Sequence, residues 1–252
     1  MLPVSQAVKV NNEVRVSREL RMKLVIFDLD QTLVDFIEVH DKATQSLFSD
    51  FFGVDAKLTE IDFAGRSLKD NFVELARLKN IPEDAFRRKR QKLLESYETT
   101  FSNKLPTDAE IYILPGAREL LSELLNTDHI IALYTGGSPG IVSSVFRVTG
   151  LGKYFRFCLY GTEVKTRADM VRLAVDKAHK ITGQDFKNKG IVIVGDSIRD
   201  IECGKLFNAL TIAVATGFHS RAQLLAAKPD YLFTDLKDYE RILAVIEKSE
   251  PR

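Results

Sequence analysis

The sequence predicts an α/β fold, in which a Rossmann-like parallel sheet carries helices on both faces and adjoins a small α-helical cap domain. Two observations predict this fold. From residue 111 onward, short apolar runs alternate with helical patterns, as is typical of a parallel sheet built from βαβ units. Residues 36–110 carry only helical patterns. We therefore expect a discontinuous core, residues 23–35 and 111–252, with the cap inserted after its first strand.

Composition limits the classes of protein that the chain can represent. Its 252 residues carry a formal net charge of +1, which gives no electrostatic reason to expect nucleic acid or an anionic membrane as partner. No apolar run reaches the roughly 18 residues of a membrane helix. Cys158 and Cys203 form no spaced metal motif and indicate a reduced, cytoplasmic protein. We expect a monomer or homodimer, and residues 1–22 form a polar N-terminal extension whose order the sequence leaves open.

The first strand and the cap follow from local patterns. Residues 24–27 are a continuous apolar run, which indicates a strand buried on both faces. About four helices are expected in the cap. One has apolar residues every four positions from Val39 to Phe51, and another opens at Ser67 with Asp70 as a capping box.

The remaining elements alternate along the second part of the chain. Five more strands are expected at residues 129–134, 155–160, 191–194, 210–214 and 231–233. Helices lie between them. One begins with Ser138 as N-cap and Pro139 as first residue, and it ends at Gly150. A terminal helix covers roughly residues 236–248.

Two acids directly follow the first strand. Asp28 and Asp30 alternate along an extended chain, so both side chains are expected to point the same way. Ligands bind just beyond the carboxyl ends of strands in open parallel sheets. Two carboxylates held close together repel each other, and a divalent cation would neutralise their negative charge. Hard oxygen ligands suit Mg²⁺. A solvated acidic turn remains the alternative for a single pair of this kind.

Polar groups also lie at or just after the ends of three later predicted strands. They are Thr135 with Gly136, then Lys165, then Asp196 with Asp200. In a parallel sheet these groups and the first acids lie along one edge. Carboxylates, hydroxyl and amide donors and a fixed cation are the parts that phosphoryl transfer requires.

The order of these motifs resembles the haloacid dehalogenase superfamily, in its phosphoglycolate-phosphatase-like branch, whose helical cap is inserted between the first and second motifs. The motifs are Phe27-Asp28-Leu29-Asp30-Gln31-Thr32, Tyr134-Thr135-Gly136, Lys165 and Gly195-Asp196-Ser197-Ile198-Arg199-Asp200. The resemblance covers about residues 23–220. It implies a Mg²⁺-dependent phosphatase that acts on a small phosphorylated metabolite.

The resemblance also implies a role for each motif residue. Asp28 would attack phosphorus and become an aspartyl-phosphate, and Asp30 would act as general acid and then base. Thr135 and the Gly136 amide would hold phosphate oxygens. Lys165 would neutralise the nucleophile and the phosphate. The implied Mg²⁺ ligands are Asp28, Asp196 and the backbone carbonyl of Asp30, and Asp200 would support this set or orient Lys165.

Three positions depart from the family pattern or stay open. Many relatives carry prolines just after the motif lysine, whereas Thr166 and Arg167 follow Lys165 here, so Arg167 is a rival for the cation. Gln31 replaces the glycine common in relatives. Arg66, in the loop between two cap helices, is either a substrate ligand or an exposed loop arginine.

Several functions share these residues. A sugar phosphomutase carries the same motifs, and the choice between water and sugar as acceptor lies in cap closure. A dehalogenase or a phosphonate hydrolase fits less well, because Asp30 supplies an acid–base group. A receiver-type signalling domain would be about half this length and lack the insertion. A noncatalytic phosphate-binding protein remains an alternative, since fold does not fix function. The sequence does not name the phosphomonoester.

Overall fold

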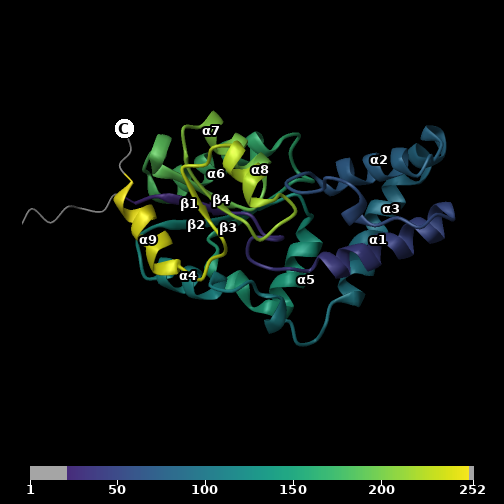
Figure 1. The fold of residues 1–252 in the computed structure, drawn as a ribbon, viewed down its shortest axis with the longest axis horizontal. Coiled ribbons are helices and arrows are strands. Elements are labelled where there is room, and N and C mark those ends of the chain that lie inside the picture. Colours follow the sequence, from purple (N-terminus) through teal and green to yellow (C-terminus); the bar gives the residue numbers. More distant parts are fainter. Residues whose placement is uncertain (1–21, 250–252) are drawn as a thin grey trace, which may run out of the picture.

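A computed structural model describes residues 22–249 of the chain; all of the predicted N-terminal extension except Met22 lies outside them. Its centre is a sheet of six parallel strands in the order β3-β2-β1-β4-β5-β6 (Figure 1). The strands are β1 (Leu24–Phe27), β2 (Ile130–Thr135), β3 (Phe157–Tyr160), β4 (Ile191–Gly195), β5 (Leu210–Val214) and β6 (Tyr231–Phe233). The fold class predicted from the sequence is confirmed.

Alternation along β1 explains why helices cover both faces. Val25 and Phe27 pack in one apolar cluster with α4 (Ala117–Leu125), α5 (Pro139–Thr149) and α9 (Tyr239–Lys248). Leu24 and Ile26 point the other way, into a second cluster with α6 (Arg167–Thr182) and α7 (Ile198–Leu206). A short helix, α8 (Arg221–Ala226), packs near β5 and β6. Successive strand residues point to opposite faces, so an all-apolar strand requires both layers.

Strand register brings the polar motifs to one edge. Phe27, the last residue of β1, pairs with Leu133 of β2 and Val194 of β4. The backbone N–H of Asp28 continues the ladder by donating to the Val194 carbonyl at 2.9 Å. The three central strands therefore end at nearly the same level, and the residues that follow them share one side of the sheet.

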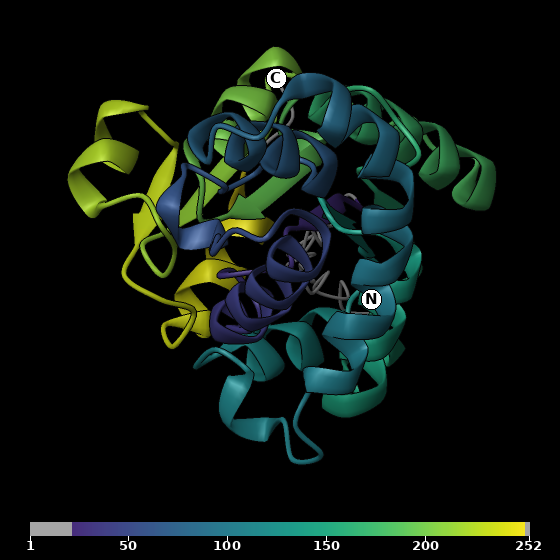
Figure 2. The same ribbon diagram turned by 90° about the vertical axis from the view of Figure 1, so that its right-hand side faces the viewer.

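The inserted segment lies beyond that edge, as Figures 1 and 2 show. It contains α1 (Ile37–Phe52), α2 (Leu68–Leu78) and α3 (Glu83–Lys104), with a 3₁₀ turn at Leu58–Glu60 and another at Glu110–Tyr112. The expected fourth helix is thus replaced, in the described residues, by short 3₁₀ turns. Buried aromatic side chains join the helices: Phe48, Phe72, Tyr97 and Phe101. We propose residues 36–110 as the cap domain on this arrangement.

Between residues 22 and 249, no helix is both long and apolar enough to cross a bilayer.

Candidate active site

Asp28 and Asp30 line one pocket at the carboxyl edge of the sheet, between core and cap. The pocket has a free volume of about 70 Å³. Asp28 is buried, and Asp30 is partly exposed. The chain turns directly after them, with Gln31 at a φ of 63°. The Gln31 amide donates to Asp35 Oδ1, and its backbone carbonyl accepts from the Thr216 hydroxyl. These two bonds hold a left-handed backbone conformation that glycine adopts more easily.

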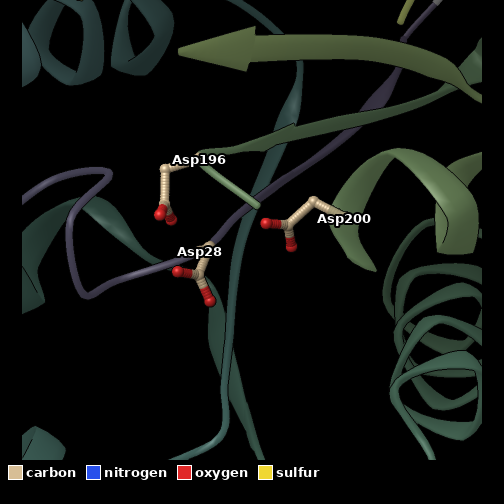
Figure 3. Close-up of side chains that lie close together, drawn as sticks. All are labelled: Asp28, Asp196 and Asp200. Carbon is tan, nitrogen blue, oxygen red and sulfur yellow. The ribbon is translucent and has the colours of Figure 1, made fainter. Parts of the chain in front are cut away.

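Asp196 lies opposite Asp28, directly after β4. One carboxylate oxygen each of Asp28, Asp196 and Asp200 lies within 4.8 Å of the others, and Figure 3 shows the three side chains close together. Asp196 Oδ1 accepts from the Thr32 hydroxyl at 3.1 Å. Asp196 Oδ2 is buried and has no hydrogen-bond donor among the described residues. A buried carboxylate oxygen without a donor is costly unless a cation meets it.

Asp200 differs from the other two acids because protein donors already occupy both its oxygens. Its Oδ2 accepts from the backbone N–H and the hydroxyl of Ser197, at 2.9 and 2.6 Å, in a capping box that opens α7. Its Oδ1 accepts from the Tyr134 hydroxyl and from Arg167. Asp200 therefore anchors neighbouring side chains, and its supporting role in the chemistry stays a prediction.

The cation beside Asp28 is Arg167. Its Nη2 donates to Asp28 Oδ1 at 2.6 Å and also pairs with Asp200. Its guanidinium lies 3.9 Å above the centre of the Tyr134 ring, and its side chain is 9% exposed. Lys165 is exposed and lines a groove next to the pocket.

The start of α6 explains why Arg167, and not Lys165, lies beside Asp28. Thr166 is the N-cap and forms a capping box with Asp169, so the helix begins at Arg167 and fixes its side chain against the sheet edge. Lys165 stays in the preceding turn. The sequence predicts either residue as the cation, and of the two only Arg167 forms an ion pair with Asp28 in the described part of the chain.

The second motif forms a close junction between core and cap. Thr135 is buried at the end of β2 and lines the pocket. Its hydroxyl accepts from the Gly137 N–H at 3.1 Å. A Cβ on Gly136 would lie 2.0 Å from the Arg66 carbonyl oxygen, so only glycine permits this approach of the cap loop. Pro139 begins α5 just beyond, so the N-terminus of a helix faces the same region.

The cap contributes Arg66 and His40. Arg66 lines the pocket, but its Nη1 is engaged by Glu74 and by the Asp62 carbonyl. His40, on α1, was not predicted from the sequence. Its Nε2 lies 3.3 Å from Asp30 Oδ1, and its Nδ1 is hydrogen-bonded to the hydroxyl of Tyr97 at 2.8 Å. The one sequence signal was its place beside Val39, on the apolar face of a predicted helix.

The site contains more carboxyl groups than basic side chains. Burial raises the pKa of Asp28 to about 7, although Arg167 opposes this shift; Asp200 and Asp30 add to it. Burial, followed by the charges of Asp28 and Asp200, raises the pKa of Asp196 well above its usual range. The carboxyl groups of Asp28 and Asp196 are therefore difficult to ionise at the same time, and one of their oxygens has no donor among the described residues. Such a group of oxygens is a suitable ligand set for a hard divalent cation.

The sequence is similar to those of known proteins. Residues 25–214 match the sequence model of a family described as haloacid dehalogenase-like hydrolase. This family generally uses a divalent metal. A phosphoglycolate phosphatase of Synechococcus elongatus is 25% identical, over 86% of this chain and 95% of that protein. The pyrophosphatase PpaX of Listeria monocytogenes is 24% identical, over 91% of this chain and 99% of that protein.

Solved structures share the fold. A β-phosphoglucomutase from Clostridium difficile superposes with a TM-score of 0.73 at 17% identity, over 90% of this chain and 97% of that one. At this identity the likeness establishes the shared fold alone.

Proposed function

We propose that this chain, which belongs to the haloacid dehalogenase-like hydrolase family, is a Mg²⁺-dependent phosphatase that hydrolyses a small phosphomonoester through an aspartyl-phosphate. One observation carries the proposal. Asp28 is buried in a pocket with a guanidinium on one of its oxygens, and a second buried acid with a donor-free oxygen lies opposite. That arrangement supplies a positioned nucleophile and a place for a cation, the two requirements of phosphoryl transfer by a carboxylate.

Asp28 is the proposed nucleophile. One of its carboxylate oxygens bonds to phosphorus while the bond from phosphorus to the leaving alcohol oxygen breaks. Arg167 holds the other oxygen and thereby orients the carboxylate. Its fixed positive charge also offsets the negative charge that collects around phosphorus. We assign to Arg167 the role that the family resemblance would give to Lys165.

Asp30 is the proposed general acid and base. It donates a proton to the leaving oxygen in the first step. In the second step it removes a proton from the water that attacks phosphorus, and Asp28 is released as a carboxylate. His40 orients Asp30 from the cap, and Tyr97 holds His40 in turn. The acid–base group therefore depends on the cap being in place.

The phosphate oxygens are held by the second motif. Thr135 and the backbone amide of Gly136 are the proposed donors, as predicted from the sequence, and both residues line the pocket. The N-terminus of α5 adds favourable partial charge close by. This set lies on the core, so we expect the phosphate to be bound by residues that do not move with the cap.

Asp28 and Asp196 would hold the Mg²⁺, together with the backbone carbonyl of Asp30. The donor-free oxygen of Asp196 and the oxygen-only ligand set fit this ion. When bound, Mg²⁺ would neutralise negative charge on the acids and on the phosphate. Asp200 lies in the same group of acids but is already occupied by Ser197, Tyr134 and Arg167.

We also propose the setting in which the enzyme works. Its substrate would be a small phosphorylated metabolite, and it would be located in the cytoplasm. It would be a monomer or a homodimer. The names of its relatives put 2-phosphoglycolate and pyrophosphate among the compounds to assay.

Phosphate release from acetyl phosphate and p-nitrophenyl phosphate tests the proposal, with Mg²⁺ and with EDTA. We expect turnover that requires Mg²⁺ and that Asp28→Asn abolishes, because an amide is a far poorer nucleophile. Lys165→Ala is the matched control and should retain turnover. Folded wild-type protein that releases no phosphate in Mg²⁺ would contradict the proposal. Isomerisation of a sugar phosphate without phosphate release would instead identify a phosphomutase.

A further inference from the structure

We propose that the leaving group of the substrate is a short, uncharged alcohol that donates one hydrogen bond to Asn71. Phosphomonoesters that carry a second anionic group are then poor substrates. This inference rests on the phosphatase function proposed above and adds the chemistry of the group that is bonded to the phosphate.

The size of the pocket limits the alcohol. Its free volume is about 70 Å³. One group the size of a water molecule needs about 10–15 Å³, so the pocket has room for only a few such groups. The phosphoryl group takes up most of that space beside Asp28 and Thr135. The alcohol that remains is a chain of a few atoms, directed away from Asp28, because the attacking and leaving oxygens are in line.

The walls on the cap side are mainly apolar. Ile37, Leu58, Phe63 and Leu68 come from the cap, and Ile141 comes from α5. Leu58, Leu68 and Ile141 are buried. Apolar walls favour a hydrocarbon chain, and they give no compensation for the desolvation of a second charge.

Each basic side chain that lines the pocket already has an anionic or polar partner. Arg66 is paired with Glu74, and Arg167 with Asp28 and with Asp200. His40 is held between Tyr97 and Asp30. A substrate carboxylate or second phosphate would have to displace Glu74 from Arg66 before it found a counter-charge. We therefore expect the pocket to discriminate against such substrates.

Asn71 supplies the specific polar contact. It lies on α2, lines the pocket and is 5% exposed. Its Nδ2 donates to the Phe63 carbonyl at 3.4 Å, and this bond fixes which end of the amide is the acceptor. Its Oδ1 is buried and has no donor among the described residues. A buried carbonyl without a donor is destabilising, and a substrate hydroxyl would satisfy it.

Three phosphate esters of two-carbon groups separate these effects: 2-hydroxyethyl phosphate, ethyl phosphate and 2-phosphoglycolate. For wild-type enzyme with Mg²⁺ we expect kcat/KM for 2-hydroxyethyl phosphate to exceed each of the others by about tenfold or more, because a site built for a hydrogen bond rejects analogues that lack it. Asn71→Leu keeps the size of the side chain and removes the acceptor. It should bring the values for 2-hydroxyethyl and ethyl phosphate together.

Glu74→Gln releases Arg66 and should raise kcat/KM for 2-phosphoglycolate relative to ethyl phosphate by about tenfold. Glu38→Gln is the matched control. It removes the same charge from an exposed cap side chain whose partner is Lys42, and the ratio between the two substrates should not change.

The outcomes are distinct. Wild-type preference for 2-phosphoglycolate, or an equal loss on all three esters in Asn71→Leu, would overturn the inference while leaving the phosphatase function intact. Equal wild-type rates on the three esters, with acetyl phosphate hydrolysed, would do the same. If Asn71→Leu does not fold, the wild-type ratios alone decide. Absence of Mg²⁺-dependent release from every ester and from acetyl phosphate would overturn both proposals.

Discussion

Replacing Arg167 by alanine should be the most damaging single change near the site that leaves the nucleophile itself intact. The Arg167 guanidinium pairs with Asp28 at 2.6 Å and with Asp200, and its side chain is 9% exposed. Removing one partner of a buried ion pair costs about 3–5 kcal/mol, because the charge left behind has no counter-charge. We therefore expect the free energy of unfolding to fall by about this amount, without metal, at pH 9, where Asp28 of the wild type is ionised because its pKa is about 7.

Lys165→Ala provides the comparison. Lys165 is exposed, so its removal should change the free energy of unfolding by no more than about 0.5 kcal/mol. The two variants should also differ in turnover. Loss of a fixed charge at developing negative charge lowers kcat by about 10²–10³, so Arg167→Ala should lose this much while Lys165→Ala stays near wild type.

Urea-induced unfolding followed by circular dichroism, at pH 9 and pH 5 in EDTA, measures the stability effect. The loss in Arg167→Ala should be smaller at pH 5. Without Arg167 the pKa of Asp28 rises further, and a protonated Asp28 no longer needs a counter-charge. A loss in Lys165→Ala equal to that in Arg167→Ala, or a stability of Arg167→Ala within about 0.5 kcal/mol of wild type, would refute the assignment of the cation.

Three further predictions concern other parts of the site. Gln31→Gly should raise the free energy of unfolding by about 1 kcal/mol, because the φ of 63° is strained for glutamine; no gain in a thermal or urea transition would contradict this. In EDTA the free energy of unfolding should fall as the pH rises from about 4 to about 7. The pKa of Asp28 is about 7 in the folded protein and 3.8 in the ordinary case, so over that range folded Asp28 keeps a proton that the unfolded chain has lost. Mg²⁺ should abolish this fall in the free energy of unfolding. His40→Asn should lower kcat by about tenfold through Asp30, and its effect should disappear in an Asp30→Asn background; additive losses in the double variant would exclude this route.

Much of the fold could be predicted because it depends on local patterns. The apolar runs at Leu24–Phe27, Leu210–Val214 and Tyr231–Phe233 have the predicted bounds as β1, β5 and β6. The run predicted from Phe155 begins two residues later in β3. Phe155 instead stacks on Phe146, with ring centres 5.5 Å apart. Apolar character marks burial, and only pairing distinguishes a strand from the residues that lead into it.

The family and the enzyme class predicted from the motifs are also confirmed. The motifs lie at strand ends, and parallel strands in register bring their ends together. The structure accordingly brings Asp28, Thr135, Asp196 and Asp200 to one edge of the sheet, as the sequence predicted. Their individual chemical roles stay predictions.

Two features of the site depend on information that a linear pattern lacks. Lys165 and Arg167 are two residues apart, and the start of α6 decides which side chain turns toward Asp28. Contact between His40 and Asp30 requires the first turn of α1 to lie beside the loop that follows β1, with Tyr97 of α3 behind His40. Such contacts arise from the packing of separate helices, which apolar spacing along one helix does not specify.

The most direct measurement of the central claim is the detection of the phosphorylated nucleophile. Wild-type enzyme mixed with acetyl phosphate and Mg²⁺, quenched in acid within one turnover and digested, should yield a peptide phosphorylated at Asp28. The Asp28→Asn variant should yield none. Phosphate release by wild type without any phosphorylated peptide, or phosphorylation at a residue other than Asp28, would contradict the account.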